Sequence, residues 1–258
     1  MVGGVGVTCW AEIESPAMSK VESIVEDFDT VCVLLTFLQG STVNWVSYDL
    51  LSSKQDVIHS HCRDSVTGKL ASKDSSGLWT ISYLQAAVPE MFKNFPLKRN
   101  MWNLQTVIAF LSNALNQTDY LEVRGYKLVH CIELLVHAHN RQQGKVENTN
   151  GFSIRLHDLL LELNIRCSTN TDESQEAALK RITNDIVVLR HSLQHEGTFD
   201  LPGYSSDKEQ NDNLNSERCR RFEFLSETTR NLIESILYLR NNNVLCGAYL
   251  HQWTNTKD

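Results

Sequence analysis

The chain has 258 residues, of which 41% are hydrophobic, and its formal net charge is −7 at pH 7. This length and apolar content indicate a globular protein with a real core, built as one large domain or two small ones. The acidic balance argues against a protein that coats nucleic acid through counterion release, although it permits a local basic cleft.

The cysteines and the first residues bear on the compartment. Seven cysteines are scattered along the chain, and they form no C-x-x-C pair, which indicates reduced thiols in a cytosol. Met1–Val5 lacks the basic flank and the apolar stretch of a signal peptide, and no run approaches the roughly 18 apolar residues of a membrane span. We therefore expect a cytoplasmic protein that is neither secreted nor inserted into a membrane.

The N-terminal region, residues 1–98, is predicted to be a small α+β unit. Ser19 and Glu22 form a capping box, and an apolar stripe of helical period continues from there to Gly40. Segments rich in β-branched and aromatic residues then predict three short strands in a meander, at 42–50, 56–66 and 78–83. Residues 1–13 are a candidate for a further strand.

The rest of the chain, residues 99–258, is predicted to be a helical bundle, with the boundary around 95–99. Apolar residues at steps of three and four predict helices around 104–115, 119–138, 152–163, 179–193 and 222–239. The first two are joined by a short polar turn and should be antiparallel. The polar stretches 141–150 and 200–216 are predicted to be loops. The fold class is therefore mainly α.

The fourth of these helices carries the motif with the most chemical content, Arg190 and His195 at R-x4-H spacing. A histidine titrates near neutral pH and can take a proton from a ribose 2′-hydroxyl. An arginine is permanently charged and forked, so it can hold phosphate oxygens as negative charge develops. An ideal helix would place these two residues about 140° apart, with a rise of about 7.5 Å, so they would not share one face.

Two geometries bring this pair together. In the first, the helix ends near His195, Gly197 takes the left-handed position that stops helices, and the imidazole swings back. In the second, two copies of the helix meet across a two-fold axis and build one composite site. A purely structural interpretation also stands, in which His195 caps the helix dipole and Arg190 is a surface ion-pair partner.

The motif and its helical context resemble the HEPN superfamily, whose small helical bundles cut RNA without a metal. The resemblance covers residues 99–240, and 126–135 and 187–197 are most similar to the ApeA-like group. In the superfamily the residue after the arginine is usually Asn, Asp or His. Here that residue is His191. The β-rich N-terminal domain of that group is normally much longer, so this chain resembles a member with a shortened one.

The resemblance implies a metal-independent endoribonuclease that needs no cofactor and acts as a homodimer, in bacterial defence or a toxin system. His195 is then the general base, Arg190 neutralises the phosphorane, and His191 positions the phosphate or tunes the dyad. Glu133 on the second helix and Gln194 are supporting residues. The densest basic cluster is a candidate RNA contact, and it consists of Arg218, Arg220 and Arg221.

Two alternatives to the nuclease remain open from the sequence, and a metal site is not predicted. The same bundle can serve as a non-catalytic interaction module that docks a partner protein. It can also be a HEPN protein that a nucleotidyltransferase antitoxin neutralises. Finally, His191 and His195 have the i, i+4 spacing that can bind zinc, but no carboxylate or cysteine completes a known zinc motif, so no metal site is predicted.

Overall fold

The computed structural model describes residues 21–40, 42–44, 47–51, 54–62, 81–115, 119–144, 151–165, 174–199 and 208–238. The candidate strand at 1–13, Ser19 of the expected capping box and the turn at 202–203 lie outside these residues. Within the described part of the chain, no helix combines the length and the apolar character needed to cross a membrane.

The described part is mainly α, as the sequence predicts. One short π-helical turn, η2 (Ser192–Glu196), follows the sixth helix. The α-helices are α1 (Val21–Gln39), α2 (Ile81–Lys98), α3 (Leu104–Leu115), α4 (Leu121–Gln142), α5 (Phe152–Glu162), α6 (Gln175–His191) and α7 (Lys208–Leu237).

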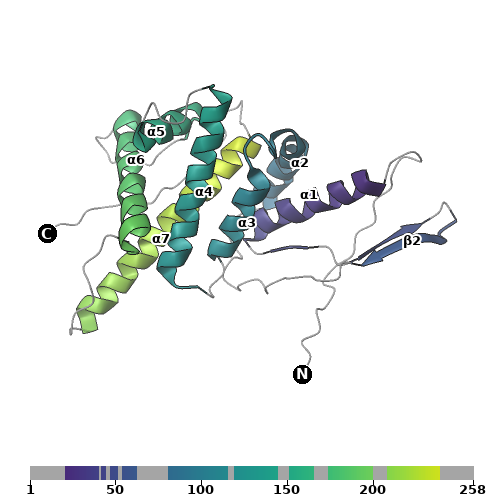
Figure 1. The fold of residues 1–258 in the computed structure, drawn as a ribbon, viewed down its shortest axis with the longest axis horizontal. Coiled ribbons are helices and arrows are strands. Elements are labelled where there is room, and N and C mark those ends of the chain that lie inside the picture. Colours follow the sequence, from purple (N-terminus) through teal and green to yellow (C-terminus); the bar gives the residue numbers. More distant parts are fainter. Residues whose placement is uncertain are drawn as a thin grey trace.

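Two strands, β1 (Ser47–Leu51) and β2 (Val57–Cys62), pair antiparallel, with Ser47 opposite Cys62. β2 lies within the predicted segment 56–66. β1 overlaps the predicted segment 42–50 from Ser47 onward and ends one residue beyond it, whereas 42–44 are not part of a strand. Ser60 donates a hydrogen bond of 2.6 Å to the Asp49 carboxylate across the pair. In Figure 1 this hairpin projects away from the helices, beyond α1.

The third predicted strand is wrong over 81–83, because these residues open α2. Their aromatic and β-branched composition favours a strand locally. The buried residues that follow, Ala87, Met91 and Phe95, recur every four positions and therefore line one face of a helix. Burial of that face outweighs the local preference. The helix runs to Lys98 and so includes Pro96, in the middle of the predicted domain boundary at 95–99.

The helices around α4 hold the candidate site (Figure 1). α3 and α6 flank α4 and run opposite to it, as expected for an antiparallel bundle. The third helix of the expected bundle differs, since α5 lies across the ends of α4 and α6. At 11 residues it has half the length of the 22-residue α4. α7 passes obliquely behind α4.

The predicted loop at 200–216 is wrong over 208–216, because α7 begins at Lys208. This stretch is polar on almost every side and gives no periodic signal. Leu214 is the buried apolar residue in it, and it extends the inner face of the helix that continues through Phe222 and Leu225. Because helix formation is cooperative, packing of the later turns also stabilises the polar first turns as helix.

One continuous hydrophobic cluster fills the described part of the molecule. Leu34 and Phe37 of α1 and Phe95 of α2 belong to the same cluster as the inner residues of α3 to α7. The division into two domains at residue 98 stays a prediction. In this cluster, residues from both sides of position 98 belong to the same core. The helix before the hairpin and the bundle after it share a single core.

Candidate active site

The candidate site lies at the C-terminal end of α6. Ser174 caps the other end, where its hydroxyl accepts a hydrogen bond of 3.2 Å from the Ala177 amide. The apolar stripe of this helix is buried as predicted, and it consists of Leu179, Ile182, Ile186, Leu189 and Leu193. With that stripe fixed inward, Arg190 and Gln194 are directed sideways towards α4, and His191 and His195 lie at the surface.

The helix ends as the sequence predicts. Gly197 has a φ of 68°, which is the left-handed conformation expected at this position, and the Thr198 amide bonds back to the Ser192 carbonyl at 3.4 Å. Between His191 and Gly197 the chain forms the π turn η2. A π turn uses more residues per turn than an α-helix, so it moves His195 back towards the face that carries Arg190.

Glu133 of α4 gathers two side chains from this helix end. The Arg190 Nε donates a hydrogen bond of 2.6 Å to Glu133 Oε1, and the Gln194 amide donates one of 2.9 Å to the same oxygen. The structure therefore brings together Arg190 and both residues predicted to support it. A charge-assisted bond of this length fixes the orientation of the guanidinium.

The guanidinium of Arg190 is held from a second side by an aromatic ring. Its Cζ lies 4.7 Å from the ring centroid of Phe152, the first residue of α5. The side chain is 31% exposed. Its two Nη nitrogens have no hydrogen-bond partner among the described residues and are not buried. The forked edge that suits a phosphate is thus presented to solvent.

The carboxylate of Glu133 is ionised more readily than usual. Burial by itself would raise its pKa, but hydrogen bonds from Gln194 and Arg190, the charge of Arg190 and a bond from His130 together lower the pKa below its usual value. His130 Nδ1 lies 3.6 Å from Glu133 Oε2. The carboxylate is therefore a fixed negative charge that holds Arg190 in place.

The two histidines of the motif pair with each other. The rings of His191 and His195 have centroids 4.8 Å apart and planes inclined by 50°. Among the described residues, no hydrogen bond or ring contact joins either histidine to Arg190. A single chain thus presents the guanidinium and the imidazoles on one helix end without direct contact between them.

The three arginines of the predicted basic cluster differ in their exposure and in their partners. Arg218 has a side chain only 9% exposed, and its Nε lies 3.4 Å from the Glu122 carboxylate. Arg221 donates hydrogen bonds to Glu217, at 3.1 Å, and to the Phe199 carbonyl. Arg220 is 74% exposed and lies 3.6 Å from Glu217. Of these three, Arg220 alone offers most of its charge to a ligand in solvent.

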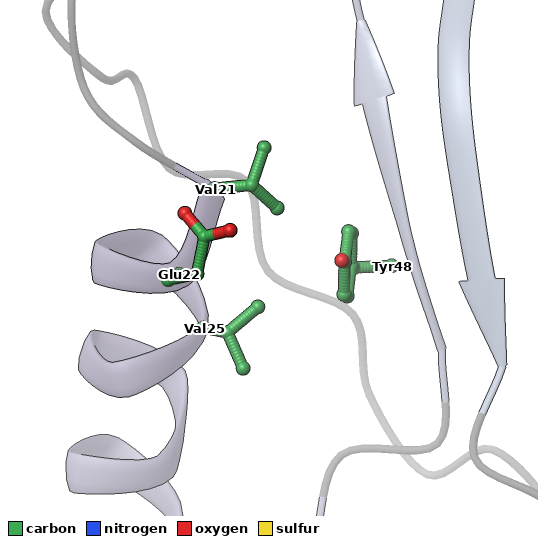
Figure 2. A pocket seen from close by; sticks show the side chains of 4 residues that line it. All are labelled: Val21, Glu22, Val25 and Tyr48. Atoms are coloured by element: carbon green, nitrogen blue, oxygen red, sulfur yellow. The ribbon is translucent and has the colours of Figure 1, made fainter.

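A surface hollow of 510 Å³ lies elsewhere, beside the hairpin. It is lined by Val21, Glu22 and Val25 of α1 and by Tyr48 of β1 (Figure 2). In Figure 1, α1 and the hairpin lie on the far side of α3 and α4 from α6. Its polar lining consists of one carboxylate and one phenol. It contains neither Arg190 nor His195, so the hollow is separate from the candidate site.

Phe152 and His130 are the site residues that sequence reasoning missed. Phe152 is the first residue of the predicted helix at 152–163, and His130 lies within 126–135, but neither position indicates a role in the site. Both belong to elements other than α6, and no local spacing links them to Arg190. The described residues contain no group of three or more His, Cys, Asp or Glu side chains able to hold a metal ion.

Comparison of the chain with family models, with curated proteins and with solved structures finds no match.

Proposed function

We propose that this protein is a metal-independent endoribonuclease of the HEPN type, which acts as a homodimer in bacterial defence or a toxin system. The observation that supports this best is the state of Arg190. Glu133 and Phe152 fix its guanidinium, while both Nη groups face solvent at the same helix end as His191 and His195. Preorganised charge of this kind stabilises a transition state without reorganisation.

The reaction uses the RNA itself as nucleophile. The His195 imidazole takes the proton of a 2′-hydroxyl, and the 2′-oxygen forms a bond to the neighbouring phosphorus. The bond from phosphorus to the 5′-oxygen then breaks, and that oxygen leaves with a proton from water. The hydroxide formed takes the proton from the imidazolium, which returns His195 to its neutral form. Arg190 holds the two non-bridging oxygens with its Nη groups, and His191 positions the phosphate. The products are a 2′,3′-cyclic phosphate and a free 5′-hydroxyl.

A second copy of the chain would complete the site. His195 and Arg190 share no hydrogen bond or ring contact within one chain. The resemblance to HEPN nucleases implies that groups from two helix ends act together on one scissile phosphate. Val188 lies on the same stripe of α6 as His191 and is 47% exposed, which offers an apolar contact beside the dyad. Two copies of this stripe, related by a two-fold axis, would place the same surface residues of both subunits against each other.

A non-catalytic interaction module is the second candidate. The pairing of Arg218 and Arg221 with carboxylates favours it, because little of the basic cluster is left for RNA in a chain with a net charge of −7. In that case Glu133 and Arg190 only join α4 to α6. A partner protein would then bind the bundle without any cleavage of RNA.

The proposal is tested with purified protein and total RNA in the presence of EDTA. We expect cleavage that leaves cyclic phosphate and 5′-hydroxyl ends, and loss of cleavage in His195→Ala. A substrate with a 2′-deoxyribose at the cleaved position should resist, because it lacks the internal nucleophile.

Glu196→Gln is the matched control, since Glu196 is exposed and adjacent to His195. It should still cut. Cleavage that persists in His195→Ala, or products with 3′-hydroxyl ends, would refute the assignment, and an intact protein that never cuts RNA would favour the interaction module.

A further inference from the structure

The two histidines at the end of α6 form a cluster with a chemistry of its own. His191 ends α6 and His195 lies in η2, and both are exposed. Their rings lie side by side, with centroids 4.8 Å apart. The rings are close enough for one nitrogen of each to reach a common ligand after small side-chain rotations.

These two imidazoles differ from the other histidines of the bundle. His139 contacts Glu162 at 2.8 Å, His130 contacts Glu133 at 3.6 Å, and His157 contacts Thr183 at 3.5 Å. His191 and His195 have no hydrogen-bond partner among the described residues. Their nitrogen lone pairs are therefore accessible, and no protein contact has to break when a ligand binds.

We propose that His191 and His195 bind one divalent transition-metal ion as a two-point chelate. Neutral imidazole is the nitrogen ligand that Zn²⁺, Cu²⁺ and Ni²⁺ prefer, and two histidines four residues apart on a helix can share one ion. No third protein ligand gathers near them in the described part of the chain, so water fills the remaining positions. An open site of this kind differs from a closed structural zinc site.

The identity of the ion follows from the ligand type. Affinity for nitrogen ligands is highest for Cu²⁺ and lower for Ni²⁺ and Zn²⁺. Mg²⁺ and Ca²⁺ prefer oxygen ligands and should not bind. If the proposed nuclease function holds, the bound ion also takes the lone pair that His195 needs as a base, so the metal inhibits cleavage. This consequence rests on the proposed function, whereas the binding itself does not.

The test is a titration of the metal-free full chain with Cu²⁺, Ni²⁺ and Zn²⁺ in competition with a coloured chelator. NMR of the histidine rings with Ni²⁺ locates the site through paramagnetic broadening. We expect the broadening to be strongest at His191 and His195. Either His191→Ala or His195→Ala should weaken the affinity on the order of tenfold or more, since loss of an outer-shell partner alone has such an effect.

Two variants serve as controls. Arg190→Ala and His130→Ala remove a neighbouring charge and a different imidazole, and both should retain metal binding. Unchanged affinity in His191→Ala, or broadening centred on other histidines, overturns the proposal even if the protein cuts RNA. Metal binding at this pair in a protein that never cuts RNA supports the proposal and counts against the nuclease function instead.

Discussion

Glu133 is the residue on which the candidate site depends. One of its oxygens accepts hydrogen bonds from both Arg190 and Gln194, at 2.6 and 2.9 Å. Removing a carboxylate from water opposes ionisation, but here the donated bonds and the positive charge outweigh that effect, because the net shift of the pKa is downward. The charge on Glu133 thus contributes to both the orientation of Arg190 and the stability of the α4–α6 contact.

The substitution Glu133→Gln should destabilise the protein by roughly 1 to 2 kcal/mol at neutral pH, between the values for exposed pairs and for charge-assisted hydrogen bonds. Because the folded pKa is depressed, this contribution is present above the unfolded value of about 4.3 and disappears as the pH falls through the folded pKa. Urea denaturation of both proteins from pH 7 to pH 3 should therefore show stabilities that begin to converge as the pH falls below about 4.3.

Glu196→Gln is the control for this titration, because Glu196 is an exposed carboxylate on the same helix end. Its curve should follow that of the wild type. If Glu133→Gln remained separated from the wild type by the same free energy down to pH 3, the proposed role of the charge would be wrong.

The element that positions the site is the turn from α6 through η2 to Phe199. Phe199 is fully buried, and its ring lies against Gly125 of α4. A β-carbon at Gly125 would lie 2.6 Å from Cζ of that ring and 3.3 Å from Cδ1 of Leu193. The absence of a side chain on α4 therefore permits the close approach of the segment that carries His195.

Gly125→Ala tests this close approach. Alanine favours the helix by up to about 1 kcal/mol over glycine, but overpacking a buried contact costs roughly 1 to 3 kcal/mol. Since the two atoms nearest to the added carbon, Cζ and Cε1, belong to the buried ring of Phe199, we expect the clash to exceed the gain and the free energy of unfolding to fall. Thermal or urea unfolding measures this directly, and cleavage of RNA should fall with it as the turn moves.

The double variant Gly125→Ala with Phe199→Leu separates the clash from other effects. A smaller side chain at 199 makes room for the added methyl group, so the alanine should cost less in this background than in the wild type. Equal costs in the two backgrounds would show that Phe199 is not the obstacle.

At the scale of the whole molecule, the question is whether one chain or two build the site. The acidic net charge of −7 disfavours extended contact with RNA, so cleavage has to rely on a local arrangement. Arg220 is the largely exposed member of the basic cluster, and Arg190 presents its Nη groups at the end of α6. Pairing two copies would double this local positive charge, while the net charge would double as well, from −7 to 2 × −7 = −14.

Mixing two inactive variants tests the composite site. Arg190→Ala and His195→Ala should each be inactive alone, but about half of the dimers in an exchanged equimolar mixture contain one copy of each. If the two motifs share one cleft, that cleft retains one arginine and one histidine, and cleavage should reappear. Light scattering has to show that dimers form. Dimers without restored cleavage would place the whole site within one chain.

Sequence periodicity alone determined much of the architecture. The mainly α class, α1, the inner face of α6 and the left-handed helix end at Gly197 all follow from residues adjacent in sequence, since helical period and glycine conformation are local properties. The errors at 81–83 and 208–216 arise where local composition favours one state and burial of distant apolar residues favours another.

Only the tertiary structure decided which groups meet. Glu133, Phe152 and Arg190 lie on three different helices, and their contact depends on how α4, α5 and α6 pack. The same packing divides the basic cluster, leaving Arg220 exposed and Arg218 buried against Glu122. Spacing along the chain carries no information about such contacts, because they are set by the burial of apolar faces between helices rather than by the polar residues themselves.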